Sequence, residues 1–214
     1  MSRGNPAAVE VLMAGIEAIT GHPAGPACRS QFQQYLDLFL RWNRTYRMTA
    51  LDSPAAVVRE LFADSLLFLP LLPVRRPLAI ADLGAGAGIP GLALRIADPR
   101  LAVTLVESRR KRVSFLRTVC RELGLDDVTV REGRAEQLVD EAPTLAAGFD
   151  IVVARSVGPA GALRALALKY LKPGGSFIAS APPDAAPRSG LEPVRVRIPW
   201  SKGTRTFLRA AKES

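Results

Sequence analysis

Histidine and cysteine are scarce in this sequence of 214 residues, which has one histidine, His22, and two cysteines, Cys28 and Cys120. His22 lies in the Gly/Pro-rich stretch 21–26, which is typical of a loop. A single loop histidine argues against a histidine-based metal centre and against a Ser/His/Asp triad. Two cysteines outside a CxxC pair do not make a disulfide framework. We therefore expect no metal site, and two reduced thiols in a cytoplasmic protein.

Long hydrophobic runs are absent as well. The apolar stretch 66–72 is too short to cross a bilayer, and Pro70 and Pro73 interrupt it. The first ten residues carry no apolar segment after a basic patch, so no secretory signal is predicted. These absences favour a cytoplasmic protein that does not enter a membrane. The hydrophobic content of 48% is enough for one packed α/β domain with a short extension.

Acidic residues are few relative to basic ones, 20 against 29, and the net charge is +9. Such a balance favours an anionic partner, nucleic acid first and a membrane surface second. Charge alone does not decide this, because surface arginines are often only solvated. One predicted helix carries six of the basic residues: Arg109, Arg110, Lys111, Arg112, Arg117 and Arg121. This helix either contacts phosphates or presents a solvated face.

Hydrophobic periodicity divides the chain into two parts. Residues 1–72 are expected to form a helical extension packed on the core, with helices near 9–19, 32–40 and 54–69. Residues 73–214 are expected to form a single globular domain in which strands and helices alternate. The predicted strands are 78–83, 102–107, 128–131, 150–154, 176–180, 194–198 and 206–210. The predicted helices between them are 90–96, 109–123 and one ending near 171, followed by a KPGG turn.

Alternation of this kind implies a mostly parallel sheet with right-handed crossovers. The last two predicted strands are joined by the short segment WSKGTR, which favours an antiparallel hairpin. A terminal hairpin on such a sheet is typical of methyltransferases. The predicted fold is therefore α/β, a Rossmann-like class I methyltransferase. It combines a mostly parallel seven-stranded sheet, a C-terminal antiparallel hairpin and an N-terminal helical extension.

The sharpest motif is DLGAGAGIPG at 82–91, which follows a predicted strand and opens a predicted helix. Glycines let a backbone turn sharply and approach a ligand closely. Gly86, Gly88 and Gly91 also satisfy the dinucleotide pattern GxGxxG, and Glu107 follows about 20 residues later. A carboxylate at the end of the second strand accepts hydrogen bonds from ribose hydroxyls. At this point both S-adenosylmethionine and a nicotinamide cofactor remain open, as does a turn without a ligand.

Three features favour S-adenosylmethionine. Asp82 precedes the loop, and a buried carboxylate suits a cationic amino-acid cofactor better than a pyrophosphate. The chain has no second substrate domain, and a simple dehydrogenase has no use for the terminal hairpin. After the third strand, the backbone groups of Ala135 and Glu136 are expected beside the adenine, although an ordinary polar loop would look the same.

Several segments together resemble the bacterial small-subunit (16S) ribosomal RNA guanine-N7 methyltransferase family, also known as the glucose-inhibited division protein B family. The resemblance runs from about Gln31 to Ala179. The matching segments are Trp42-Asn43, Tyr46, Met48-Thr49-Ala50, Asp64-Ser65-Leu66, the glycine loop, Leu105 to Ser108, Lys111-Arg112, Phe115-Leu116, Arg134-Ala135-Glu136 and Phe149 to Arg155. The Ile-Pro-Gly ending of the loop and the Ala-Arg pair after the fourth strand are the most specific.

The resemblance implies an S-adenosylmethionine-dependent enzyme acting on small-subunit ribosomal RNA, naked or in an assembling particle. With Asp82 added from the loop pattern, the expected cofactor contacts are Asp82, Gly84, Gly86, Gly88, Ile89, Glu107, Ala135, Glu136 and Arg155. The same resemblance places Arg155 beside the methyl donor and Lys111 and Arg134 near the RNA, and we expect these three residues to serve catalysis. A monomer is expected.

The sequence departs from the family at three places. Arg47 stands where the family usually has Asn, and Glu60 stands where it usually has His. The segment 179–182 reads ASAP where the family usually has a Lys-Gly pair at the end of the fifth strand. The lost lysine matters most, because it should lie at the active-site face. These changes leave the cofactor assignment intact and leave the target nucleotide open.

The expected chemistry fits a chain with little histidine or cysteine. Guanine N7 carries a free lone pair, so methyl transfer to it needs no general base, and alignment of donor and acceptor contributes up to about 7–11 kcal/mol. Methylation of an exocyclic amine usually uses an Asn/Asp-Pro-Pro-aromatic motif where this chain has Ala154 to Val157. Methylation of cytosine C5 needs a cysteine nucleophile there, and none is present.

Two roles stay open at the sequence level. Arg155 either donates to guanine O6 or a phosphate, or is a surface arginine at a strand end. Trp42 and Tyr46 either stack on a flipped base or pack in the core. Two rival functions also remain: a related methyltransferase with another nucleic-acid target, and a catalytically silent relative that binds RNA or the ribosome.

Overall fold

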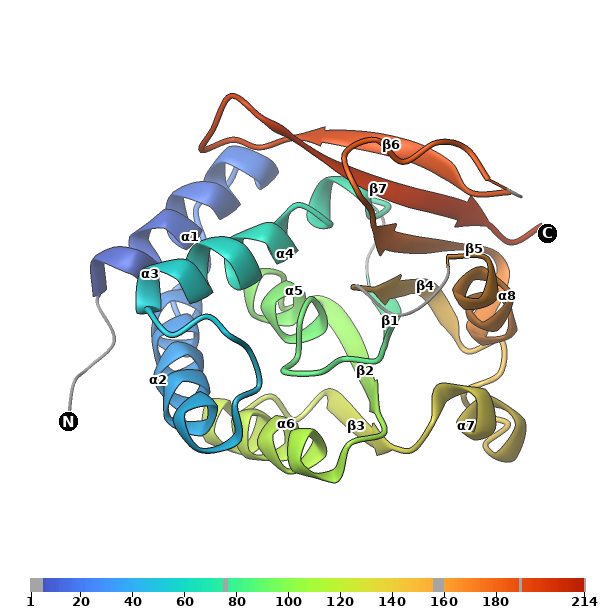
Figure 1. Ribbon diagram of the computed structural model, residues 1–214, viewed down its shortest axis with the longest axis horizontal. Coiled ribbons are helices and arrows are strands. Elements are labelled where there is room, and N and C mark those ends of the chain that lie inside the picture. Colours follow the sequence, from blue (N-terminus) through green and yellow to red (C-terminus); the bar gives the residue numbers. More distant parts are fainter. Residues whose placement is uncertain (1–5, 75–76, 156–159, 189, 214) are drawn as a thin grey trace.

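The computed structural model describes residues 6–74, 77–155, 160–188 and 190–213. Its centre is a seven-stranded sheet in the order β3-β2-β1-β4-β5-β7-β6 (Figure 1). The strands are β1 (Leu78–Leu83), β2 (Leu101–Glu107), β3 (Val128–Glu132), β4 (Phe149–Ala154), β5 (Leu171–Ser180), β6 (Glu192–Arg197) and β7 (Thr204–Ala211). β1 to β5 run parallel, whereas β7 is antiparallel to both β5 and β6. The predicted fold class and its terminal hairpin are confirmed.

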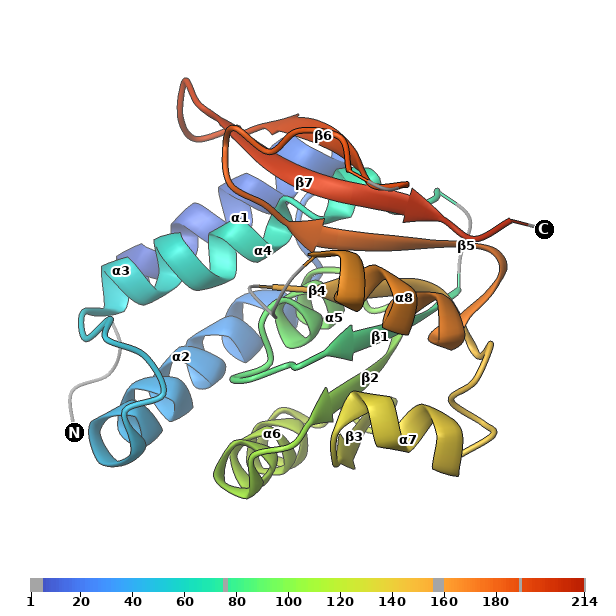
Figure 2. The same cartoon turned by 45° about the vertical axis from the view of Figure 1, so that its right-hand side comes forward.

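Helices cover both faces of the sheet, as the turned view in Figure 2 shows. They are α1 (Pro6–Thr20), α2 (Cys28–Tyr46), α3 (Pro54–Val57), the π-helical turn η1 (Val58–Ala63), α4 (Asp64–Leu66), the 3-10 turn η2 (Leu69–Leu71), α5 (Gly91–Ala97), α6 (Arg110–Leu123), α7 (Ala135–Glu141) and α8 (Ala160–Tyr170). None of the helices in the described part of the chain is long and apolar enough to span a bilayer.

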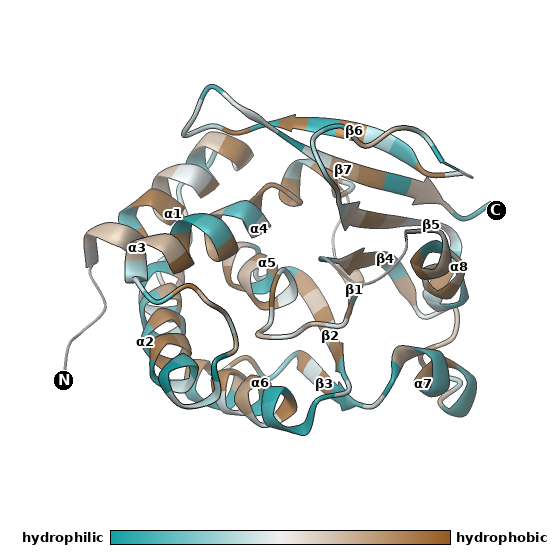
Figure 3. Cartoon of the chain, viewed as in Figure 1, coloured by the Kyte–Doolittle hydropathy of each residue, from teal (hydrophilic) through white to brown (hydrophobic). Residues whose placement is uncertain are grey.

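Two hydrophobic cores lie on opposite faces of the sheet. Ile80 belongs to the core shared with α1, α2, α5 and α6, and its neighbour Ala81 belongs to the core under α7 and α8. Successive residues of a strand point to opposite faces, so a strand buried on both sides reads as a continuous apolar run. Apolar residues accordingly dominate the strands, and polar ones gather on the outer helix faces (Figure 3). The division at residue 72 stays a prediction, although the extension and the sheet share one core.

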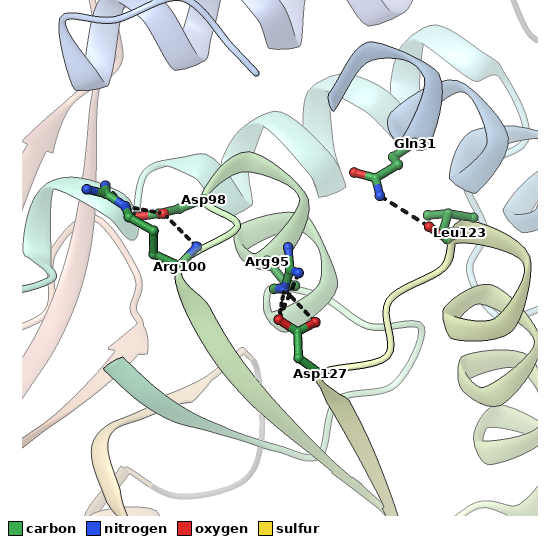
Figure 4. A network of polar contacts seen from close by, with 6 residues as sticks. All are labelled: Gln31, Arg95, Asp98, Arg100, Leu123 and Asp127. Carbon is green, nitrogen blue, oxygen red and sulfur yellow. Dashed lines mark hydrogen bonds and ion pairs between the residues drawn. The ribbon is translucent and has the colours of Figure 1, made fainter. Parts of the chain in front are cut away.

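The edge of the sheet where β2 and β3 begin is tied by polar contacts (Figure 4). Arg95 of α5 pairs with Asp127, which immediately precedes β3, at 2.8 Å. Arg100 pairs with Asp98 at 2.8 Å just before β2. Gln31 Nε2 donates to the carbonyl of Leu123 at the end of α6. These contacts fix one edge, and the loops that carry the candidate chemistry leave from the opposite edge.

The structure corrects two expected elements. The single helix predicted over 54–69 is instead α3, η1 and α4 in sequence, followed by η2 at Leu69–Leu71. Ser53 caps α3 by accepting from Ala56 N, as a helix start should, but the middle widens into a π-helical turn whose Glu60 carbonyl accepts from Arg155. The KPGG turn lies inside β5, whose pairing with β4 shifts register there. Ser156 and Val157, weighed in the motif after β4, lie outside the described residues.

Candidate active site

The glycine loop leaves β1 at the carboxyl edge of the sheet and is fastened to β2. The amides of Gly84 and Ala85 both donate to Val106 O, at 2.9 and 3.0 Å. Gly88 has φ +85°, a left-handed conformation that favours glycine, and a Cβ there would lie 2.9 Å from the Tyr35 hydroxyl. The Tyr35 hydroxyl also donates to Ala87 O. The N-terminal extension therefore helps to shape the loop.

A cleft of about 540 Å³ opens beside this loop. Volumes of this size hold nucleoside-sized ligands. It lies outside the carboxyl ends of β1 and β4, where the strand order reverses, which is the usual ligand position in open α/β sheets. The lining residues are Phe39, Met48, Thr49, Leu61, Gly84, Ala85, Gly86, Ala87, Ile89, Glu107, Ser108, Arg109, Arg112 and Arg155.

Glu107 closes β2 at the wall of the cleft, and its carboxylate is held on both oxygens. One oxygen accepts from Gly86 N and the other from Arg109 N, each at 2.8 Å. The Arg112 guanidinium lies 3.7 Å away. Each carboxylate oxygen has a second acceptor site. Glu107 is thus oriented by the backbone and can still accept hydrogen bonds from a ligand in the cleft.

Asp82 lies beneath the loop rather than in the cleft wall. Its Oδ2 accepts from Gly91 N at 2.8 Å, while Oδ1 is buried without a hydrogen-bond partner among the described residues. Burial raises the pKa of this carboxyl to about 7, the bond from Gly91 lowers it, and the charge of Glu107 raises it. An unpartnered buried oxygen next to the loop fits a site for a cationic group.

Replacing Asp82 with asparagine should change how stability depends on pH. The folded-state pKa of about 7 lies above the ordinary value of 3.8, so the folded protein binds this proton more tightly than the unfolded chain. Stability contributed by the protonated carboxyl is therefore present at low pH and is lost as pH rises towards 7, by up to about 4 kcal/mol. The melting temperature of the parent, minus that of Asp82→Asn at the same pH, should therefore be lower at about pH 8 than at about pH 4. A melting gap that stays constant over this range would contradict the assignment.

Arg155 enters the cleft from the end of β4 and is held by the N-terminal extension. Its Nη2 donates to Glu60 O at 2.6 Å and lies 3.4 Å from Asp64 Oδ2. The other Asp64 oxygen lies 3.0 Å from Arg205 Nε, and Arg205 also donates to Ala181 O. Burial lowers the pKa of the Arg155 guanidinium, and the Asp64 carboxylate opposes this shift. We call Asp64, Arg155 and Arg205 the Asp64 cluster.

The family model described as "rRNA small subunit methyltransferase G" matches residues 28–181 of the chain, which include the loop, Glu107 and Arg155. The chain belongs to this family. Curated relatives of the same description are 38% identical in Streptococcus sanguinis, over 71% of this chain and 64% of the relative, and 42% identical in Xanthomonas oryzae, over 68% and 65%. A relative in Geobacillus kaustophilus is 34% identical over 84% of this chain and 80% of its own length. The chain thus spans less than two thirds of the length of the first two of these relatives.

Solved structures support the fold of this family member. The O-methyltransferase TomG of Streptomyces achromogenes, in complex with SAM, has a TM-score of 0.56 at 20% identity, over 85% of this chain and 90% of its own. A putative O-methyltransferase of Klebsiella pneumoniae has a TM-score of 0.56 at 18% identity, over 97% of both chains. At these identities the likeness concerns the fold alone.

Only some of the site residues that were predicted from the sequence line the cleft. Gly84, Gly86, Ile89, Glu107 and Arg155 line it. The predicted residues outside the lining are Asp82, Gly88, Lys111, Arg134, Ala135 and Glu136. Asp82 and Gly88 belong to the loop region described above. Of the others, Arg134 precedes α7, the Ala135 carbonyl accepts from Tyr170, and Lys111 lies over the Tyr46 ring. Their roles stay predictions.

Sequence reasoning missed the contribution of the N-terminal extension. Phe39, Met48, Thr49 and Leu61 line the cleft, yet their periodicity or loop position gave no sign of it. It also missed Arg205, which the hairpin brings beside Ala181 at the end of β5. The family usually has a lysine close to that position. Arg205 therefore supplies a cation near the end of β5, where the family usually has a lysine and this chain has none.

Proposed function

We propose that the protein is an S-adenosylmethionine-dependent methyltransferase that transfers methyl to N7 of a guanine in 16S ribosomal RNA. The observation that best supports this proposal is the cleft. The glycine loop, Glu107 at the end of β2 and Arg155 after β4 all line it, with β1 between the last two. Membership of the family described as rRNA small subunit methyltransferase G supports the reaction class.

The residues present fit the cofactor. The glycine loop permits close approach, and the Glu107 carboxylate would accept from the ribose hydroxyls. A cationic amino group of the cofactor would stabilise the charge of the buried, unpartnered Asp82 oxygen. Backbone groups of Ala135 and Glu136 follow β3 and would contact the adenine edge. When bound, the cofactor supplies an electrophilic methyl on a sulfonium.

The protein side of the reaction is positioning. The cleft lining contains no histidine or cysteine among the described residues, and attack by guanine N7 needs no proton removal. Arg155 would donate to guanine O6 or to a phosphate and so align N7 with the methyl. The purine gains positive charge during transfer, and Asp64 counters the charge of the two arginines that it holds. Lys111 and Arg134 would contact the RNA.

A second candidate is a related methyltransferase with another nucleic-acid target, because the strand-five lysine is missing and Arg205 stands nearby. Transfer of labelled methyl to small-subunit particles and to naked 16S RNA, both from a strain lacking this gene, separates the two candidates. Nucleoside analysis should show 7-methylguanosine. Another methylated nucleoside would favour the second candidate, and no cofactor binding by calorimetry would reject both and leave the silent relative.

We also propose that the enzyme acts in the cytoplasm as a monomer without a bound metal. The RNA substrate supports the location. Within the described residues, no group of three or more His, Cys, Asp or Glu side chains could hold a metal ion. Size-exclusion chromatography with light scattering should give the mass of one chain, and a mass of two chains would contradict the monomer.

Asp64→Asn should lower the rate of methyl transfer by about 10- to 100-fold, because a small misplacement of a positioning group is costly. The amide keeps the shape but no longer holds Arg155 and Arg205 by charge. Cofactor affinity should stay near that of the parent. Asp140→Asn, which removes an exposed ion pair with Lys169 on the far face, is the matched control. Equal rates for the parent and Asp64→Asn would remove the positioning role.

A further inference from the structure

A second, smaller cavity of about 280 Å³ adjoins the cleft where the end of α2 meets the start of α6. Both segments lie close together near the lower edge of Figure 1. We call this cavity the Tyr46 pocket; its lining residues are Tyr46, Arg47, Met48, Arg109, Arg110, Lys111 and Arg112. Met48, Arg109 and Arg112 also line the cleft, so the two cavities share one wall.

The lining of the Tyr46 pocket is strongly cationic. Its seven lining residues include five cations and no carboxylate. Arg112 is 3.7 Å from Glu107, whereas no ion pair holds the side chains of the other four cations within the described part of the chain. Cations without carboxylate partners that converge on one cavity suit a phosphate group.

Tyr46 adds an aromatic surface to this charge. Its ring packs on Trp42 with centroids 5.1 Å apart, and Trp42 packs in turn on the buried Phe115. Tyr46 is nevertheless 43% exposed, and the Lys111 ammonium lies 5.4 Å from its ring centroid. Exposed aromatic rings beside cations are the surfaces on which single-stranded bases stack. A base stacked on Tyr46 would take the place of the Lys111 ammonium, which would turn towards the phosphate.

Arg47 supplies an independent sign of function. It ends α2 in the left-handed conformation, with φ 46° and ψ 55°. This C-terminal position favours glycine or asparagine, and an arginine there is strained. A strained residue that lines a cavity favours a ligand role over a packing role. An asparagine at this position would relieve the strain but would remove one of the five cations from the pocket.

The pocket lies away from the expected methyl acceptor. Glu107 ends β2 and Arg155 follows β4, with β1 between them, so the two strand ends are about 10 Å apart. The Tyr46 pocket adjoins the Glu107 side of the cleft through Arg109 and Arg112. The Tyr46 pocket therefore lies on the side of the cleft opposite Arg155.

We propose that the Tyr46 pocket binds a nucleotide of the RNA substrate other than the methylated one. Its base stacks on the Tyr46 ring, and its phosphate lies among Arg47, Arg110 and Lys111. This inference rests on the proposed function, because it assumes an RNA substrate. It adds a second contact point that would orient the strand relative to the cleft.

The test measures binding of a fluorescently labelled single-stranded RNA by the full chain, by anisotropy over a range of salt. Tyr46→Ala should weaken binding about 5- to 150-fold, and Tyr46→Phe should restore it, because stacking needs the ring and not the hydroxyl. Arg47→Asn should weaken binding and reduce the salt slope by about 0.7, while its melting temperature stays equal to or above that of the parent. Arg121→Asn, the same charge change near the other end of α6, is the control and should have a smaller effect.

The outcomes separate this inference from the proposed function. Calorimetry with S-adenosylmethionine checks that every variant still binds the cofactor. If the parent binds RNA and Tyr46→Ala binds equally well, or Arg47→Asn behaves like Arg121→Asn, the pocket assignment is overturned while the proposed function stands. If the parent binds the cofactor but no RNA under any condition, the RNA substrate itself fails, and the inference fails with it.

Discussion

Arg155→Ala should lower the rate of methyl transfer by about 100-fold, without a comparable loss of cofactor affinity. Arg155 is the cleft residue that reaches across from β4, and two groups of the N-terminal extension hold it, the Glu60 carbonyl and the Asp64 carboxylate. Its guanidinium is therefore fixed in direction, as alignment of an acceptor base requires. Because the proposed acceptor, guanine N7, needs no activation, loss of alignment is the main way in which such a substitution can act.

Single-turnover transfer of labelled methyl to small-subunit RNA measures this effect, and calorimetry measures cofactor affinity separately. Arg155→Lys keeps the charge but loses the two-pronged donor geometry, so it should recover only part of the rate. Arg59→Ala removes an arginine that is 71% exposed on η1, the π-helical turn whose Glu60 carbonyl holds Arg155. This variant should leave the rate unchanged. A rate for Arg155→Ala equal to that of Arg59→Ala would show that Arg155 is only a strand-end arginine.

The parts of the fold that the sequence predicted are those set by local patterns. Glycines with left-handed backbone, the apolar runs of β1 and β4, and Gly124 at the end of α6 are each specified within a few residues. Hydrophobic periodicity distinguishes strands from helices because burial repeats every two residues in one and every 3.6 in the other. The crossover rule then fixes the hand of the connections, whereas the strand order comes from the structure and was not predicted.

The parts that could not be predicted depend on residues far apart in the chain. Asp64 and Arg205 meet only because the hairpin folds back beside β5 and α4 packs under it, and no periodicity records that meeting. The π-helical turn at 58–63 is likewise invisible in a helical pattern that continues through it. The cleft wall from α2 and the following loop looked like core or connection, because Phe39 and Met48 are apolar whichever surface they face.

Glu107→Ala should weaken cofactor binding by at least about 100-fold. Two charge-assisted hydrogen bonds to ribose hydroxyls are expected from this carboxylate, and such bonds contribute about 1.5–3 kcal/mol each. The change also leaves the amides of Gly86 and Arg109 without the oxygens that now hold them, so the loop loses its fastening to β2 at this point. Both effects act on the same ligand and in the same direction.

Calorimetric titration with S-adenosylmethionine and S-adenosylhomocysteine measures the loss. Glu132→Ala is the matched control, because Glu132 ends β3 directly beside Glu107 in the sheet but does not line the cleft. Glu107→Gln should be intermediate, since its amide nitrogen must face one of the two backbone N–H donors that the carboxylate accepts from. RNA binding should persist in all three variants, because Tyr46, Arg47 and Lys111 are unchanged and make no contact with Glu107. Parent-like affinity in Glu107→Ala would mean that the end of β2 does not hold the ribose, and the cofactor would have to be placed elsewhere.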